Sequence, residues 1–336
     1  MKKLAVLMPT YNAAAYLNES IDSVLNQTYR NFDLYILDDN SQDKSENIIK
    51  RNKDPRIIYR KNSENLGISK TLNLGLDEVL DKYEFIARMD ADDWCYPERL
   101  KKQITFLNHN TEVVMCGTQG YHTKDIKTTP NMTWKYPVSY GNIKYSLLFT
   151  ASFNHQSVMM RSKFLLDNHL HYDESIESCE DWALWIRIVK LGKVVNIDEI
   201  LMKIRILENS NHRNPKHREL HLRERSQIIS DYYKTFNINL SATDIYNIYY
   251  REEPVTQEKF LVDLNKIITA FNTLEKSELK ELESQIQHSL KYRFAREILA
   301  FWKRSGVSKV SPKIWLKVLK NVHFTSKTRL IKNLIS

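Results

Sequence analysis

The sequence has few of the residues that mark flexible, disulfide-rich or membrane-spanning chains. Seven glycines and eight prolines in 336 residues leave little room for low-complexity linkers. The three cysteines, Cys95, Cys116 and Cys179, follow no metal-ligand spacing and cannot form an even disulfide framework. No apolar run approaches the about 18 residues of a membrane-spanning helix, and the apolar stretch at 4–8 is too short for a signal peptide. We therefore expect a folded cytoplasmic protein whose contact with a membrane is at most peripheral.

The net charge of +9 is concentrated near the carboxyl end. Residues 290–336 contain twelve Lys or Arg and one acid, Glu297, so they carry +11 while residues 1–289 sum to −2. Ser311 and Pro312 predict the start of a helix there, with apolar side chains on one face and lysines on the other. Such a helix either packs on the rest of the protein or binds an anionic membrane surface.

Short apolar runs alternate with helical patterns in the first third of the chain. Strands are predicted at 4–8, 34–37, 57–59 and 84–87, and helices at 17–25, 42–51, 68–80 and from Pro97. This alternation predicts an α/β fold of the Rossmann type, with a mostly parallel sheet flanked by helices. In such sheets ligands bind beyond the carboxyl ends of the strands.

The remaining chain changes character near residue 210. Further strands are expected near 113–119 and 154–160, followed by a helix at 180–191. Beyond residue 215 the pattern is helical without strand alternation. Because the length exceeds the about 250–300 residues at which a single core stops growing, we predict two parts, a domain at 1–210 and a helical region at 211–336.

Three carboxylates crowd the segment Asp90-Ala91-Asp92-Asp93, which follows the fourth predicted strand. Adjacent anions repel one another unless a cation or hydrogen-bond donors compensate them. Oxygen ligands of this kind suit Mg²⁺ or Mn²⁺, which complete their coordination with substrate phosphates and water. The competing interpretation is an Asp-rich turn that caps the next helix.

Polar residues also follow the other strands. Asp38-Asp39 can accept hydrogen bonds from a base or ribose, and Tyr11 and Asn12 offer an aromatic face and an amide. Glu180-Asp181 begins a predicted helix, where the helix dipole also favours acidic residues. Each of these features alone is as well explained by an ordinary surface or helix terminus.

Taken together in strand order, these segments resemble the motifs of the inverting family 2 glycosyltransferases (GT2) of the GT-A fold, including those of bacterial polysaccharide and O-antigen assembly. The resemblance spans roughly residues 3–205 and implies transfer of a sugar from a UDP-sugar to an acceptor hydroxyl. The segments are Pro9-Thr10-Tyr11-Asn12, Asp38-Asp39-Asn40-Ser41, Asn65-Leu66-Gly67, Asp90-Ala91-Asp92-Asp93 and Glu180-Asp181-Trp182.

The resemblance also implies roles on the donor side. Asp92 would bind the Mn²⁺ or Mg²⁺ ion that bridges the diphosphate, and Asp90 would contact ribose or reach the metal through water. Arg88 either contacts the donor or neutralises the neighbouring carboxylates. The full set of donor-binding residues would be Pro9, Thr10, Tyr11, Asp39, Asn65, Gly67, Arg88, Asp90 and Ala91, with Tyr11 stacking on the base.

On the acceptor side, the resemblance makes Asp181 the general base and Glu180 its neighbour, and a single displacement inverts the anomeric centre. His155 and Trp182 would lie near the acceptor, although His155 is equally well explained as a core histidine. Relatives often add a metal ligand in an Arg-x-His motif. Here Leu207 follows Arg205-Ile206 in place of that histidine, which leaves the metal shell incomplete unless His212 substitutes.

Two other functions compete with sugar transfer. A metal-dependent nucleotidyltransferase also needs a nucleotide and clustered acids, but the chain has no glycine-rich phosphate loop and the Glu180-Asp181 pair would have no role. A nucleic-acid-binding protein would use the basic tail and its aromatic side chains. We favour a transferase at the inner face of the bacterial membrane, with a glycan or lipid-diphosphate-linked acceptor and no nucleic acid partner. Its helical region would contact the membrane or form a homo-oligomer.

Overall fold

The computed structural model describes residues 3–127, 133–207, 215–277 and 284–306. Contacts divide the chain into two compact units. The first comprises residues 1–144 and 150–217, and the second comprises 145–149 and 218–336. The short segment Tyr145–Phe149 therefore belongs to the second unit although both of its chain neighbours belong to the first.

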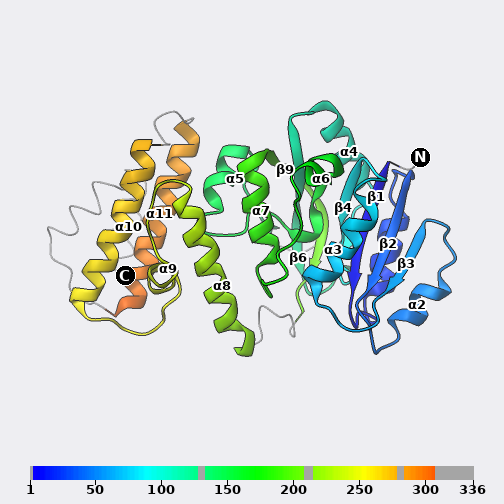
Figure 1. Cartoon of the computed structure of the whole chain (residues 1–336), viewed down its shortest axis with the longest axis horizontal. Helices are drawn as coiled ribbons and strands as arrows, with labels where there is room; N and C mark the ends of the chain where they lie inside the picture. The colour runs from blue at the N-terminus through cyan, green and yellow to red at the C-terminus, as the bar shows by residue number, and fades with distance from the viewer. Residues whose placement is uncertain (1–2, 128–132, 208–214, 278–283, 307–336) are drawn as a thin grey trace. The chain divides into compact units, whose positions relative to one another are not determined.

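The first unit begins with the predicted alternation of strands and helices (Figure 1). Four parallel strands lie in the order β3-β2-β1-β4, so the central strand β1 is bonded on both sides. The strands are β1 (Leu4–Thr10), β2 (Phe32–Asp38), β3 (Ile57–Lys61) and β4 (Phe85–Arg88). The helices are α1 (Leu17–Leu25), α2 (Ser45–Arg51), α3 (Ile68–Val79) and α4 (Arg99–His109).

Antiparallel pairing enters the sheet beyond β4, which makes the nine-stranded sheet mixed. Strand β8 (Met159–Arg161) pairs antiparallel with β4 and with β6 (Val113–Thr123). The long strand β9 (Lys193–Arg205) runs parallel to β6 and antiparallel to β5 (Trp94–Cys95). The elements α5 (Tyr140–Ser146), α6 (Ser162–Asp167), α7 (Glu180–Leu191) and β7 (Thr133–Trp134) complete this part.

The strand expected near 154–160 forms only at its end. His155–Ser157 is a 3-10 helix instead. The Ser157 side chain donates to the carbonyl of Asn154 at 2.8 Å and accepts the N–H of Thr118 at 3.1 Å. Such local bonds from a serine side chain compete with a strand ladder, and they turn the chain here.

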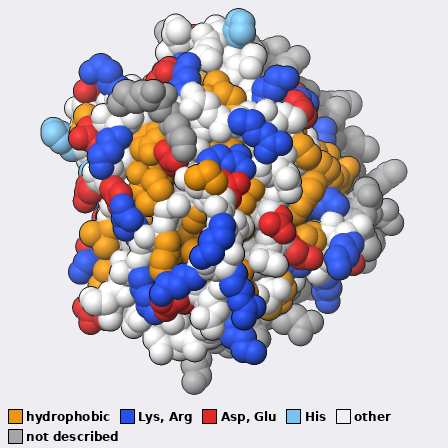
Figure 2. All heavy atoms as spheres, turned by 90° about the vertical axis from the view of Figure 1, so that its right-hand side faces the viewer, with side chains coloured by type: hydrophobic (Ala, Val, Ile, Leu, Met, Phe, Trp, Pro, Cys, Tyr) orange, Lys and Arg blue, Asp and Glu red, His pale blue; other side chains and the backbone are white. Residues whose placement is uncertain are grey.

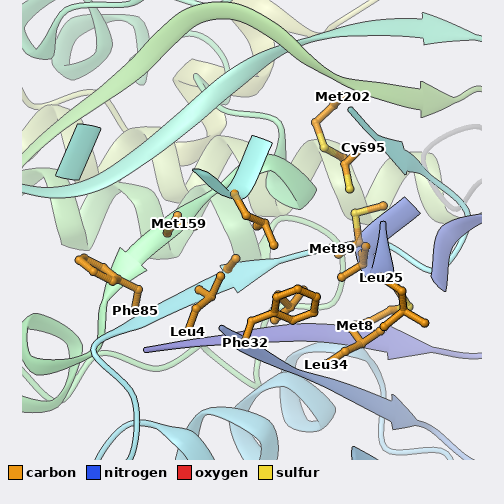
Figure 3. Packing of buried hydrophobic residues seen from close by; sticks show 14 of the residues in the cluster. Leu4, Met8, Leu25, Phe32, Leu34, Phe85, Met89, Cys95, Met159 and Met202 are labelled. Atoms are coloured by element: carbon orange, nitrogen blue, oxygen red, sulfur yellow. The ribbon is translucent and has the colours of Figure 1, made fainter. Parts of the chain in front are cut away.

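The core of the first unit lies against β1 and β2. Leu4, Val6 and Met8 of β1 are fully buried, as a strand bonded on both sides and covered by helices requires. Figure 3 labels Leu4 and Met8 in this cluster, together with Phe32 and Phe85 from the two flanking strands. Burying apolar side chains of this size contributes about 1.5–3 kcal/mol each, so this cluster holds the strand ends in place.

The outer edge of this sheet carries charges of both signs. On the face that contains β3 and α2, basic and acidic side chains are interspersed with apolar ones (Figure 2). Lys61 pairs with Glu46 at 2.5 Å and Arg60 with Glu78 at 2.7 Å. This mixture agrees with the near-neutral charge of residues 1–289.

The described part of the second unit is helical. It contains α8 (Pro215–Lys234), α9 (Ala242–Tyr249), α10 (Gln257–Ser277) and α11 (Ser284–Ser305), the first of which begins in the first unit. Phe149 packs edge-on against Phe294 with ring centroids 5.0 Å apart, which ties the 145–149 segment to α11. None of the helices in the described ranges combines the length and hydropathy needed to cross a membrane. The helix predicted from Ser311 lies outside those ranges.

Candidate active site

The carboxyl ends of β1, β2 and β4 meet at one edge of the sheet. In the parallel register Thr10 lies beside Asp38, and Leu7 lies beside Arg88. The loops that follow these strands carry most of the predicted donor-binding residues. The structure therefore brings the loop after β1 between the two acidic loops.

Asp38 and Asp39 have different environments although they are adjacent. Asp38 is fully buried and accepts the Ser41 N–H at 2.8 Å and the Tyr59 hydroxyl at 2.7 Å. Both of its oxygens are thus used within the protein. We conclude that Asp38 stabilises the loop after β2. Asp39 is then the acid of the pair that remains for contact with a ligand at the carboxyl edge of the sheet.

Asp39 joins the end of β2 to the loop before α3. One oxygen accepts the Asn62 amide and the Leu66 N–H, both at 2.8 Å, and the other accepts the Gly67 N–H at 2.9 Å. A carboxylate offers about four lone-pair sites, so one remains for another donor. Gly67 has a φ of 82°, which favours glycine at this helix start. Asp39, Asn65 and Gly67 therefore lie together in one hydrogen-bonded group.

The loop after β1 is tied to the loop after β2. Asn12 adopts a φ of 49°, its N–H donates to the Ser41 hydroxyl at 3.0 Å, and its side-chain oxygen accepts the Gln42 N–H at 2.8 Å. Tyr11 is 52% exposed. Its ring has free surface for stacking, whereas Pro9 is half-buried and Thr10 is buried.

Asp90, Asp92 and Asp93 form a cluster in which one carboxylate oxygen of each lies within 4.8 Å of the others. Asp93 is buried and accepts the Arg205 N–H at 2.7 Å, which fixes the cluster to β9. Burial, together with the charge of Asp90, raises the pKa of Asp92 to about 6. The pKa of Asp93 is also raised, mainly by burial. The oxygen ligands and the mutual repulsion both fit a divalent cation.

Several neighbours support this cluster. The Ser20 hydroxyl lies 2.8 Å from the carbonyl of Ala91, which is buried. Arg205 donates to the Asp92 carbonyl at 2.8 Å and pairs with Glu19 at 2.9 Å. Leu207 is half-buried two residues later. His212, the alternative ligand, lies outside the described residues.

Arg88 links the acids to the interior. It is 2% exposed, and its Nη1 lies 2.6 Å from an Asp90 oxygen and 2.7 Å from the Met89 carbonyl. Its Nε and Nη2 are buried and have no hydrogen-bond partner among the described residues. Because the guanidinium is so well covered, the geometry favours the interpretation in which Arg88 neutralises and orients Asp90.

Glu180 and Asp181 are the first two residues of α7. Glu180 is 8% exposed, and burial together with the charge of Asp181 raises its pKa to about 8. Asp181 is half-buried, and one of its oxygens accepts the Trp182 N–H at 2.6 Å. Trp182 is only 3% exposed and offers little surface to an acceptor.

His155 lies beside this acid pair. Its Nδ1 is 3.8 Å from a Glu180 oxygen, and its Nε2 is 2.8 Å from the Tyr172 hydroxyl. Burial, together with the positive charge of Arg88, lowers the pKa of His155 well below its usual value. The charges of Arg88 and Asp90 also affect the pKa of Glu180, so both groups lie within electrostatic reach of this carboxyl group.

Sequence reasoning missed Tyr172 and the contribution of Arg205 to the acidic cluster. Tyr172 lies in the loop between α6 and α7, where no motif marks it. The extra carboxylate Asp93 was visible as part of the acidic run, but its bond to β9 was not. Only the pairing of β9 with β5 and β6 brings Arg205 to the acids.

Comparison with known proteins relates the chain to glycosyltransferases. Residues 5–170 match the model of "Glycosyl transferase family 2". An uncharacterized glycosyltransferase of Haemophilus influenzae is 32% identical over 61% of the chain and 66% of its own length. One of Methanocaldococcus jannaschii is 34% identical over 62% of the chain and 72% of its own length.

Solved structures share the fold at lower identity. TarS of S. aureus in complex with UDP-GlcNAc superposes with a TM-score of 0.56 and 17% identity, over 90% of this chain and 88% of that one. The mannosyltransferase PcManGT of Pyrobaculum calidifontis in complex with GDP-Man and Mn²⁺ gives 0.52 and 14%, over 95% and 85%. These likenesses confirm the predicted GT-A architecture with its helical carboxyl-terminal region.

Proposed function

Because the chain belongs to glycosyl transferase family 2, we propose that it transfers a sugar from a UDP-sugar to an acceptor hydroxyl and inverts the anomeric centre. One observation carries this proposal. Arg88 pairs with Asp90 at 2.6 Å, and the charges of Arg88 and Asp90 also act on the buried Glu180 carboxyl group, which supports one site for the acids after β4 and those at the start of α7. A relative of the same fold binds UDP-GlcNAc, which supports a uridine donor.

Asp90 and Asp92 would hold Mn²⁺ or Mg²⁺, and Asp93 completes the cluster from the buried side. When bound, the ion would act as a Lewis acid and stabilise the charge on the departing diphosphate. The binding of Mn²⁺ by PcManGT supports this role. Arg88 would fix the orientation of Asp90, and the Arg205 guanidinium would keep the Asp92 backbone in place.

The nucleoside would occupy the edge formed by the loops after β1 and β2. Tyr11 would stack on the base, and the remaining lone pair of Asp39 would accept a hydrogen bond from it. Thr10, Asn65 and Gly67 would shape this edge, since each is hydrogen-bonded to Asp39. The same Asp39 carboxylate would therefore shape the pocket and contact the base.

Asp181 would act as the general base. Burial and the charge of Asp181 raise the pKa of Glu180 to about 8, so Glu180 would be mostly protonated at neutral pH and would not compete with Asp181 for the proton of the acceptor. Asp181 would take the proton of the acceptor hydroxyl as the oxygen attacks the anomeric carbon opposite the leaving diphosphate. A nucleotidyltransferase would leave this pair without a role, so we do not favour that alternative.

The acceptor would be a glycan or a lipid-diphosphate-linked sugar in the assembly of a surface polysaccharide. The charge of +11 on residues 290–336 supports attraction to an anionic membrane at the cytoplasmic face. A homo-oligomer contact through the helical region is the competing use of this part of the chain.

Turnover with a panel of UDP-sugars and glycan acceptors, measured as released UDP, tests the proposal. We expect UDP release that depends on the acceptor, and we expect Asp181→Asn to abolish it without lowering the melting temperature. The exposed Asp22 provides a matched control, because Asp22→Asn also removes one carboxylate. Near wild-type turnover by Asp181→Asn, or release of diphosphate from nucleoside triphosphates in place of UDP release, would contradict the proposal.

A further inference from the structure

A line of three polar side chains connects the loop before α7 to the acid pair. The Tyr172 hydroxyl lies 2.8 Å from His155 Nε2, and His155 Nδ1 lies 3.8 Å from Glu180 Oε1. All three residues are largely buried; Tyr172 is 4% exposed and Glu180 is 8% exposed. The histidine ring therefore lies between a phenol and a carboxyl group, away from bulk water.

The backbone of Tyr172 is held in place through both its N–H and its carbonyl group. The Asn73 side chain of α3 accepts the Tyr172 N–H at 2.9 Å and donates to the Tyr172 carbonyl at 3.0 Å. Asn73 is itself buried and also donates to Glu174 at 3.0 Å. The buried Asn73 amide therefore fixes the backbone of Tyr172, from which the side chain extends to His155.

The chemistry of the ring explains why a tyrosine suits this position. Burial keeps His155 neutral, so one ring nitrogen carries a proton and the other accepts. An ionised Glu180 would favour the tautomer with the proton on Nδ1, in which Nε2 accepts from the Tyr172 hydroxyl. A protonated Glu180 would favour the other tautomer, in which Nε2–H donates to the Tyr172 oxygen. A phenol serves both states because its oxygen donates and accepts.

We propose that Tyr172 is a positioning residue of the transfer reaction, which acts through His155 to hold the Glu180 carboxyl group beside Asp181. The proposal rests on the function proposed above. The 3.8 Å separation exceeds a hydrogen bond, and such contacts often shorten when substrate binds. The charged or titratable groups that face this line are Arg88 and Asp90 from the β4 end, Asp181 from α7, and Tyr172 and His155 themselves.

The main test compares Tyr172→Phe with a matched control. Tyr35→Phe removes a hydroxyl from a tyrosine that is 3% exposed, where it lies 3.3 Å from the Tyr83 hydroxyl in the same unit. We expect Tyr172→Phe to lower kcat about tenfold at an unchanged donor KM, as expected for a small misplacement of a reacting group. We also expect the acidic limb of the kcat–pH profile to move, since the acid pair titrates as a unit. Tyr35→Phe should change neither.

A double-mutant cycle tests whether Tyr172 acts through His155. With Tyr172→Phe and His155→Gln combined, we expect kcat no lower than that of the slower single variant. Asn73→Ala, which leaves the Tyr172 and His155 side chains intact, should also lower kcat. Multiplicative losses in the cycle, or wild-type kcat and pH profile in Tyr172→Phe, would overturn the inference.

A readout independent of turnover separates this inference from the proposed function. Nitrogen-15 NMR of the histidine rings should show a changed tautomer balance of His155 in Tyr172→Phe and the wild-type balance in Tyr35→Phe. An unchanged His155 ring would overturn the inference even in an active enzyme. If the wild-type chain released no UDP from any donor, the proposed function would fall, whatever the ring shows.

Discussion

Replacing Asp39 with asparagine tests whether one carboxylate both stabilises the loops at the carboxyl ends of β1 and β2 and contributes to binding of the nucleotide. In the native loop its two oxygens accept three N–H groups, from Asn62, Leu66 and Gly67. Asparagine keeps one oxygen and puts an NH₂ group in place of the other. Whichever way the amide is turned, at least one N–H donor of the loop then faces another donor.

The size of the effect follows from these bonds. Asp39 is 4% exposed, so the displaced backbone N–H has little access to water. Losing a buried hydrogen bond to a charged group costs about 1.5–3 kcal/mol. For a unit of this size the loss corresponds to a fall of about 3–12 °C in the melting temperature. The loop that begins α3 would loosen as well, and donor affinity would fall with it.

Thermal unfolding and calorimetric titration with UDP measure the two consequences separately. We expect Asp39→Asn to lower both the melting temperature and UDP affinity, and the exposed control Asp22→Asn to change neither. A normal melting temperature with weak UDP binding would mean that Asp39 serves only the ligand. A normal melting temperature with normal UDP binding would refute the reasoning altogether.

Three further predictions concern the acids and the tail. The pKa of Glu180 is raised from 4.5 to about 8, so the folded state keeps a proton that the unfolded state loses, and the free energy of unfolding falls as the pH rises between these values. In urea unfolding at several pH values, Glu180→Gln should make this fall smaller, and an unchanged pH dependence would contradict the prediction. Asp92→Asn should abolish sugar transfer without lowering the melting temperature. EDTA should inactivate the wild-type protein and added Mn²⁺ should restore its activity, whereas full activity in EDTA would exclude a metal ion in the reaction. Removing residues 307–336, which carry seven Lys or Arg and no acid, should weaken co-sedimentation with anionic vesicles at low salt and leave UDP binding unchanged. If the full chain bound neutral vesicles as well as anionic ones, the electrostatic attraction would be refuted.

The parallel half of the fold and the family could be predicted from local patterns. Strand β1 and helix α7 stand where the apolar run and the helical spacing predict them, because these patterns are read from a few neighbouring positions. The family prediction is confirmed by the matched residues 5–170. The family was recognisable because the set of short motifs occurs together in the order of the strands, ending with Glu180-Asp181 at a helix start.

The antiparallel half was harder to predict. The 3-10 helix at His155–Ser157 replaces a strand because Ser157 bonds to the backbone of Asn154 and Thr118. A bond to Thr118, 39 residues away, has no local signal in the sequence. The inclusion of Tyr145–Phe149 in the second unit is equally non-local, since it depends on packing against α11.

By itself the sequence determined which residues stand at the strand ends, because alternating burial and turn chemistry act over a few neighbouring positions. The resemblance of these segments to family 2 glycosyltransferases then singled out Asp39, Asp92 and Asp181 as the acids of interest. Only the tertiary structure decided which of their neighbours share their surroundings. Arg205 reaches the acidic cluster, and Tyr172 reaches His155, through strand pairing and helix packing that join residues far apart in the chain, and burial among those partners raises the pKa of Glu180.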